Sequence, residues 1–96
     1  MNSLGEKIRT LRESKSILLR QVAAYLEIDT ALISKIERGE RRLTRDQVTK
    51  LAKFYKVSDE ELLTLWLSDK LLDTIENEPF AMQGLNKAKT ILRTLI

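Results

Sequence analysis

Apolar side chains recur at three- and four-residue steps along most of the chain, the spacing that aligns them on one face of an α-helix. The pattern divides the chain into six predicted helices. The first three cover about residues 3–14, 19–26 and 30–38, the fourth follows Thr44, the fifth follows Ser58, and the sixth follows Pro79. The pattern therefore predicts an all-α fold of five helices with a C-terminal sixth.

Three of the predicted helices begin with the spacing of a capping box, in which a Ser or Thr side chain accepts from a backbone amide and a Glu or Gln reaches back. The pairs are Ser3–Glu6, Thr44–Gln47 and Ser58–Glu61. The fifth helix then continues without a breaker as far as the segment Asn77-Glu78-Pro79. The fifth helix is therefore predicted to be long.

The second and third helices are short and are separated only by Glu27, Ile28 and Asp29. Asp29 can cap the third helix, which ends at Arg38-Gly39, where glycine tolerates a left-handed conformation. Apolar residues of this helix share an inner face. Its outer face carries Thr30, Ala31, Ser34 and Lys35. This is the helix-turn-helix arrangement of proteins that read the major groove of DNA, although periodicity alone also fits a generic helical bundle.

The C-terminal helix has apolar residues at Leu85, Ala88, Leu92 and Leu95, an a/d-like seam. Such a seam needs a covering surface. It either enlarges the core of the chain or meets a second copy.

Composition narrows the chemistry that 96 residues can perform. The chain is 43% hydrophobic and has no Cys and no His, which excludes disulfides, thiol and imidazole catalysis and the usual zinc sites. We expect no enzyme activity, no cofactor and no metal. No apolar run approaches the ~20 residues of a bilayer span, and the N-terminus lacks a signal core. We expect a cytoplasmic protein that makes no contact with membranes.

Charge is distributed unevenly. Residues 1–56 carry 13 Lys and Arg against 7 Asp and Glu, whereas residues 57–96 carry 4 against 7. A basic N-terminal part indicates a polyanionic partner such as double-stranded DNA. On charge alone, a solvated surface remains an equal alternative.

Residues 5–63 resemble the lambda-repressor, Cro and xenobiotic-response-element family of helix-turn-helix domains. The resemblance lies in VAAYLEIDTALISKIERGER and LAKFYKVSDEELL, with further matches at Leu11-Arg12 and Val57-Ser58. It implies a lambda-repressor-like five-helix domain and a sequence-specific DNA-binding transcriptional regulator. Phage-type repressors and controllers of restriction-modification operons are both small regulators of this shape.

The resemblance also implies roles for individual residues. The positions that match base-reading positions are Thr30, Ala31, Ser34 and Lys35, whose hydroxyl, methyl and ammonium groups suit base edges. Basic residues around Gly39 suit the DNA backbone, with two weaker candidates upstream: Arg38, Arg41 and Arg42, then Arg20 and Lys15. Arg12 and Glu37 match positions that often form a structural ion pair.

Two departures from the family pattern concern docking. Leu18-Leu19 stands where the family usually has a Thr or Ser cap followed by Gln at the start of the second helix, so a familiar phosphate and base-pair-end contact is missing. Glu27 stands where the family often has Gly, so this residue either adopts a positive φ or lies in an altered turn.

We expect residues 1–65 to form the DNA-binding domain and residues 66–96 to form a helical extension that makes a homodimer. The expected interface residues are Trp66, Leu71, Ile75, Leu85, Ala88, Leu92 and Leu95. The alternative is an antitoxin-like or other protein-binding module that keeps the fold and binds another protein through these helices. Salt-dependent DNA binding would separate the two.

Overall fold

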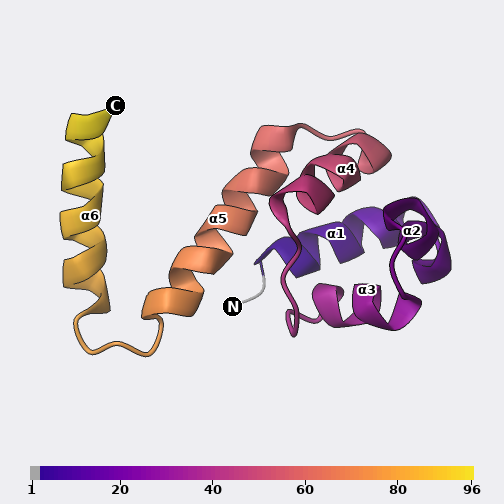
Figure 1. Ribbon diagram of the computed structural model, residues 1–96, viewed down its shortest axis with the longest axis horizontal. Coiled ribbons are helices and arrows are strands. Elements are labelled where there is room, and N and C mark those ends of the chain that lie inside the picture. The colour runs from indigo at the N-terminus through magenta and orange to yellow at the C-terminus, as the bar shows by residue number, and fades with distance from the viewer. Residues whose placement is uncertain (1–2) are drawn as a thin grey trace.

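The computed structural model describes residues 3–96 and contains six α-helices and no strand over that range (Figure 1). The helices are α1 (Ser3–Ser14), α2 (Leu19–Leu26), α3 (Thr30–Glu37), α4 (Arg45–Tyr55), α5 (Asp59–Ile75) and α6 (Ala81–Leu95). The predicted all-α architecture is confirmed. No helix within the described residues combines the length and the apolar character that a membrane crossing requires.

The core lies among α1 to α4 and the first half of α5. α5 packs against α4 and α1, α3 packs against α1 and α2, and Figure 1 shows these helices gathered into one body. Each helix contributes the apolar face that the sequence pattern predicts. The most deeply buried apolar side chains are Ile8, Val22, Ile33, Val48, Leu51, Ala52, Tyr55 and Leu62.

Of the three capping boxes that the sequence predicts, one forms in full, one forms in part, and the one at the start of α1 is replaced by another contact. Thr44 and Gln47 make a full capping box, in which the Gln47 amide donates to Thr44 Oγ1 (3.2 Å) and the Thr44 amide donates to Gln47 Oε1 (2.9 Å). Ser58 Oγ accepts from the amide of Glu61 (3.1 Å). The Glu61 carboxylate instead pairs with Lys7 at 3.0 Å, so it links α5 to α1.

The start of α1 differs from the predicted Ser3–Glu6 capping box. Ser3 is the first residue of the helix, and the amides of Ser3 and Leu4 donate to the Asp69 carboxylate at 3.1 and 3.0 Å. Asp69 comes from α5 and is fully buried. A carboxylate at a helix N-terminus satisfies open amides and complements the helix dipole. A distant residue therefore performs the role that the local pattern assigned to Ser3.

α5 also fixes the segment between α3 and α4. Trp66 Nε1 donates to the carbonyl of Leu43 at 2.7 Å, and Trp66 is only 8% exposed. We expected Trp66 in a dimer interface. That expectation is corrected, because its indole lies in the core of its own chain. The expected domain boundary at residue 65 also falls inside α5, before the buried Trp66 and Asp69.

Three residues other than glycine follow helix ends with a left-handed backbone conformation. Ser16, Glu27 and Lys56 have φ values of 54°, 58° and 58°. After α2, the amide of Ile28 donates to the Ala23 carbonyl (2.9 Å), as in a Schellman ending. Gly39, with φ of 80°, ends α3 in the way the sequence predicts. Backbone hydrogen bonds therefore close these three turns at residues with side chains, where glycine would be unstrained.

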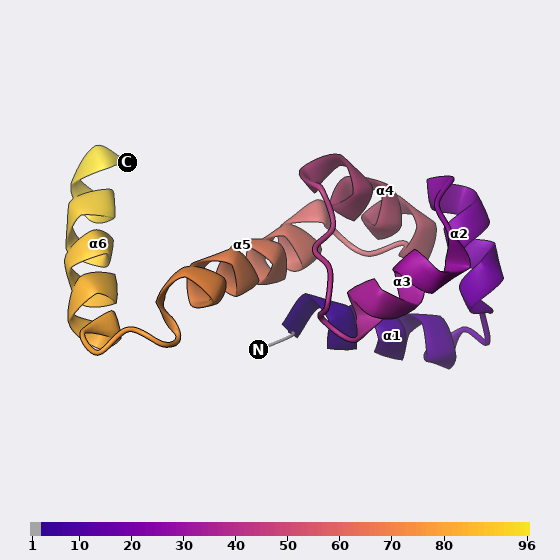
Figure 2. The same cartoon turned by 60° about the horizontal axis from the view of Figure 1, so that its bottom comes forward.

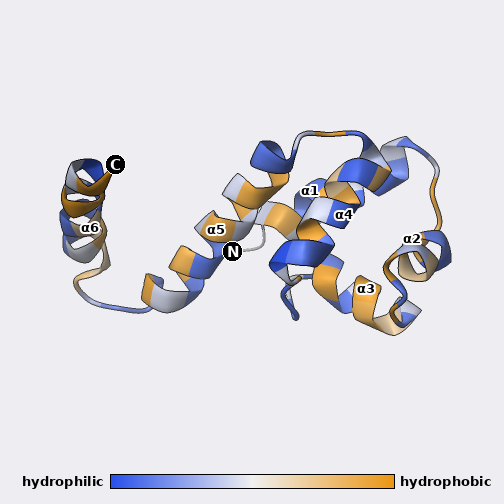
Figure 3. Ribbon diagram, turned by 45° about the horizontal axis from the view of Figure 1, so that its top comes forward, coloured by the Kyte–Doolittle hydropathy of each residue, from blue (hydrophilic) through white to orange (hydrophobic). Residues whose placement is uncertain are grey.

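α6 stands away from the rest of the molecule in both views (Figures 1 and 2). None of its residues is buried, and it joins α5 through a turn that contains Pro79. Most of the large exposed apolar side chains in the described chain belong to α5, this turn and α6: Leu67, Leu71, Phe80, Met82, Ile91, Leu92, Leu95 and Ile96. Figure 3 shows apolar residues, coloured orange, along both α5 and α6.

Candidate nucleic-acid interface

The turn between α2 and α3 orients α3 relative to α2. Glu27 adopts the positive φ that was one of the two alternatives predicted for it. Asp29 follows in an extended conformation, and its side chain accepts from the amide of Ala31 at 3.3 Å. The helix-turn-helix unit thus forms without a glycine in its turn.

α3 divides cleanly into an inner and an outer face. Ile33 and Ile36 are buried in the core. The four residues expected to read bases lie together on the outer side, with Ser34 half-buried and the others exposed: Thr30, Ala31, Ser34 and Lys35. This face combines hydroxyl, methyl and ammonium groups, which are able to contact base edges in the major groove.

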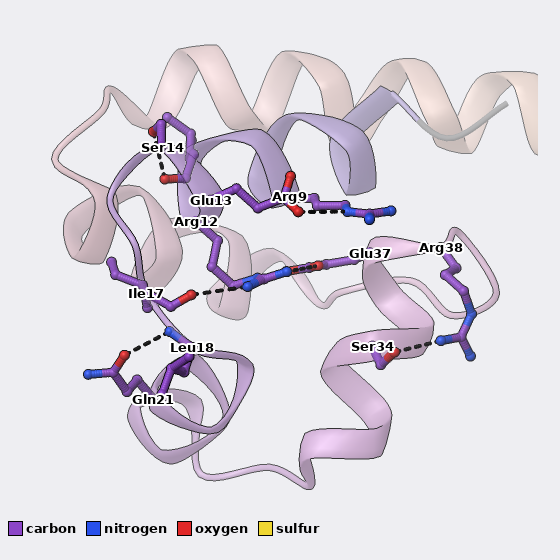
Figure 4. A network of polar contacts seen from close by, with 11 residues as sticks. Arg9, Arg12, Glu13, Ser14, Ile17, Leu18, Gln21, Ser34, Glu37 and Arg38 are labelled. Carbon is purple, nitrogen blue, oxygen red and sulfur yellow. Dashed lines mark hydrogen bonds and ion pairs between the residues drawn. The ribbon is translucent and has the colours of Figure 1, made fainter.

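The C-terminal end of α3 is held by an ion pair between Arg12 of α1 and Glu37. Arg12 Nε and Nη2 donate to the two Glu37 carboxylate oxygens at 2.8 and 3.1 Å, and Nη1 donates to the carbonyl of Ile17 at 3.0 Å (Figure 4). The side chains are 14% and 6% exposed. The hydrogen bond to Glu37, opposed by burial and aided by the charge of Glu37, raises the pKa of Arg12. One guanidinium therefore joins α1, α3 and the α1–α2 segment.

Tyr55 lies in the electrostatic range of this pair. Burial is the main cause that raises the pKa of Tyr55 to about 12, and the negative charge of Glu37 adds to the effect while Arg12 opposes it. The phenol is fully buried. Ionised tyrosine is therefore strongly disfavoured in the folded chain.

The basic residues near the end of α3 differ in how freely they can reach a partner. Arg38 is exposed but donates to Ser34 Oγ, as Figure 4 shows, and pairs with Glu40. The hydrogen bond to Glu40 is the main cause that raises the pKa of Arg38 and lowers that of Glu40. Arg41 is exposed, and the described residues include no ion-pair partner for it. Arg20 and Lys15, the weaker candidates, are also exposed.

Arg42 has a structural position that the sequence interpretation did not foresee. Its Nε and Nη2 donate to the Asp73 carboxylate at 2.8 and 2.6 Å, and its Nη1 lies 3.7 Å from Asp69 Oδ2. The hydrogen bond to Arg42 is the main cause that lowers the pKa of Asp73. Arg42 therefore ties the α3–α4 segment to α5, and this engagement leaves it poorly placed as the freely extending phosphate ligand that we expected.

The start of α2 keeps half of a capping box. Leu18 has no side-chain acceptor, but its amide donates to Gln21 Oε1 at 2.7 Å (Figure 4). The reciprocal capping bond of a Ser or Thr is absent at this position, as the sequence indicates.

Asp69 and Asp73 are the supporting residues that the sequence interpretation missed. They are four residues apart on α5 and follow Trp66 on the side that faces the domain. That spacing is a usable signal, because an acidic i,i+4 pair on a partly buried helix face needs cationic or amide partners. Among the described residues no cluster of three or more acidic side chains could hold a metal ion.

The short α2, the three-residue turn and the outward α3 on a helical core define a helix-turn-helix domain. The helix-turn-helix domain family matches residues 3–65, and the chain belongs to that family.

Two curated relatives carry regulatory names. The HTH-type transcriptional repressor RghR of Bacillus subtilis (strain 168) is 38% identical over 64 residues, which cover 66% of this chain and 47% of the relative. The control protein C.BamHI of Bacillus amyloliquefaciens is 35% identical over 60 residues, or 62% of this chain and 74% of that protein. The chain thus spans about half the length of RghR.

A solved structure has the same fold over nearly the whole chain. The clp gene regulator ClgR from Corynebacterium glutamicum superposes with a TM-score of 0.61 at 20% identity, covering 91% of this chain and 86% of that one. At this identity the likeness concerns the fold alone.

Replacing either member of the Arg12–Glu37 pair should destabilise the fold. Arg12→Ala or Glu37→Ala leaves a mostly buried charge without its partner, so we expect the free energy of unfolding to fall by about 3–5 kcal/mol. Urea denaturation measures this loss. Arg41→Ala is the matched control and should change it by less than about 0.5 kcal/mol. The double variant Arg12→Met/Glu37→Met should be more stable than either alanine variant, and equal melting of Arg12→Ala and Arg41→Ala would contradict the role of the pair.

Stability should fall at alkaline pH because of Tyr55. Its pKa is raised from 10.0 in the reference state to about 12 in the fold. The unfolded chain loses this proton first, so the contribution is complete below pH 10 and is lost as pH rises from 10 to 12. The loss should reach about 2–3 kcal/mol. Denaturant midpoints of the wild type and Tyr55→Phe over this range test the effect, and parallel curves would rule it out.

Proposed function

We propose that this protein is a sequence-specific DNA-binding transcriptional regulator in which α3 lies in the major groove. The observation that carries the proposal is the outer face of α3, where Thr30, Ala31, Ser34 and Lys35 lie together on a helix fixed by the core and by Arg12–Glu37. A rigidly held reading face is what discrimination between base pairs requires.

The chemistry of this face suits direct readout. Lys35 has the reach and charge to donate to guanine O6 or N7, and Thr30 can donate, accept or contact a thymine methyl group. Ala31 adds a methyl group. Ser34 accepts from Arg38 and retains a hydroxyl proton to donate. We assign base contacts to these four residues.

Backbone contacts are assigned to Arg38 and Arg41, with smaller contributions from Arg20 and Lys15. Their exposed positions and the basic balance of residues 1–56 support this assignment. We assign Arg42 to a different task. Its pairing with Asp73 holds the segment that carries Arg41.

The names of the relatives support the same class of function. RghR is a repressor and C.BamHI is a control protein. We propose a repressor or a restriction-modification controller that acts in the cytoplasm.

We further propose that the regulator acts as a homodimer. The apolar residues of α5 and α6 outside the core support this. Leu71, Ala88, Leu92 and Leu95 are exposed, and Ile75 and Leu85 are partly buried. A two-fold pair would cover the same stripe on each chain and present two α3 helices to half-sites about one DNA turn, or ~34 Å, apart. Trp66 is left out of the interface because it is buried.

Substitutions at Lys35 and Arg41 should have different effects on DNA binding. An operator is first selected from a random duplex library with the wild type, and affinity is then measured on a panel of its variants at several salt concentrations. Lys35→Ala should reduce the free energy of operator binding by about 1–3 kcal/mol and weaken the preference for one base at a single position. Arg41→Ala should weaken all sequences alike and flatten the salt slope by about one unit. Uniform loss for Lys35→Ala would refute base reading, and no DNA binding even at low salt would favour a protein-binding module.

Removing residues 79–96 should leave a folded monomer with weak operator binding. α6 contributes no buried residue, so circular dichroism should still report the helices of the core. A monomer engages one half-site and loses the tethering gain, which is about a hundredfold in apparent affinity. Sedimentation measures the association state. A truncated chain that remains dimeric would move the interface to α5, and loss of the core helices would make the tail part of the fold.

A further inference from the structure

We propose that the two chains of the dimer exchange their C-terminal helices, so that α6 of each chain packs against α5 of the second copy. This inference rests on the homodimer proposed above and specifies how its interface is built. Its occupant is a second copy of this chain, which supplies both the helix that docks and the face that receives it.

The receiving face is the outward side of α5. Leu67, Leu71 and Ile75 repeat at four-residue steps, and Leu67 and Leu71 are about half exposed. The opposite side of the same helix carries Trp66 and Asp69, which are buried against the domain. α5 therefore has two faces with different surroundings. One is committed to its own domain, and the other is an apolar stripe open to solvent.

The docking face is the seam of α6. Leu85, Ala88, Leu92 and Leu95 recur at steps of three and four residues, and α6 buries none of them. A helix of this length gains most of its stability from packing an apolar face. α6 consequently needs a surface that its own domain does not provide.

The connection between α5 and α6 holds the two helices apart within one chain. Glu76 ends α5 in helical geometry, the amide of Glu78 donates to the Ile75 carbonyl at 3.0 Å, and Pro79 follows. Proline restricts the residue before it to extended backbone. The chain therefore leaves α5 before α6 begins, and Figures 1 and 2 both show α6 separated from its own α5.

Charge complementarity supports a second copy as the partner, because α6 is held away from its own α5 (Figures 1 and 2). α6 carries Lys87, Lys89 and Arg93 and no acidic residue. The last turn of α5 and the connection after it carry Glu76 and Glu78. A basic helix and an acidic receiving edge on the same chain are complementary between two copies, and in a two-fold pair each contact occurs twice.

Charge reversal in two different chains tests the exchange. One variant is Lys89→Glu/Arg93→Glu, which makes the edge of α6 acidic. The other is Glu76→Lys/Glu78→Lys, which makes the receiving edge basic. Alone, each places like charges together and should weaken the dimer by about tenfold or more in sedimentation equilibrium. An equimolar mixture should recover the wild-type association constant, because each α6 then meets the opposite charge on the other chain.

The mixture separates exchange from docking within one chain. If α6 packs on its own α5, each variant keeps its internal repulsion and the mixture stays dissociated, while a chain with all four substitutions recovers. That result overturns the proposal, as does wild-type dimerisation of either variant alone. Lys50→Glu/Lys53→Glu makes the same charge change on α4 and should leave association unchanged.

Further measurements on the same samples distinguish failure of the helix exchange from failure of the proposed DNA-binding function. The variants alter only exposed residues outside the core, and circular dichroism verifies their helical content. Fluorescence anisotropy on the selected operator reports α3 independently. A wild type that sediments as a monomer yet binds the operator overturns the dimer and the exchange but retains the DNA-binding proposal. A dimer that recovers in the mixture but binds no DNA supports the exchange and overturns the DNA-binding proposal.

Discussion

The bidentate ion pair between Arg12 and Glu37 is the contact on which the orientation of α3 depends. α3 is eight residues long, too short to be stable in isolation. Burial of Ile33 and Ile36 favours its docking, but the hydrophobic effect is not directional. The pair supplies the direction, with two hydrogen bonds between planar groups and a third to Ile17. The outward face of α3 is thus set by a residue of α1.

α5 extends this support and connects the two ends of the molecule. On its inner side, Asp69 accepts from the first amides of α1, and Trp66 donates to the Leu43 carbonyl. Asp73 on the same side accepts from the Arg42 guanidinium. Its outer side carries the apolar stripe. The helix that braces the α3–α4 segment is therefore the helix on which the proposed second copy packs. A change in association would act directly on an element that positions the candidate DNA-binding surface.

Features that depend on near neighbours could be predicted from the sequence. The caps at Asp29 and Thr44 and the apolar face of α3 each follow from residues within one or two helical turns, and the fold class follows from their repetition. The family resemblance extended this to the Arg12–Glu37 pair.

Features that depend on distant partners could not be predicted in this way. Asp69 caps a helix more than sixty residues earlier in the chain, and Arg42 pairs across 31 positions. Trp66 looks like an interface residue when only its apolar neighbours are considered, because the Leu43 carbonyl that it meets carries no sequence signal.

The left-handed conformations at Ser16, Glu27 and Lys56 have one more consequence, for adaptation to temperature. Each costs about 1 kcal/mol relative to an unstrained residue. The turns at Ser16 and Lys56 are exposed and lie outside the α2–α3 turn that precedes the outer face of α3. Glycine or asparagine at these turns would release part of that strain, so a lineage moving to a hotter habitat could gain thermal tolerance there while keeping the same operator.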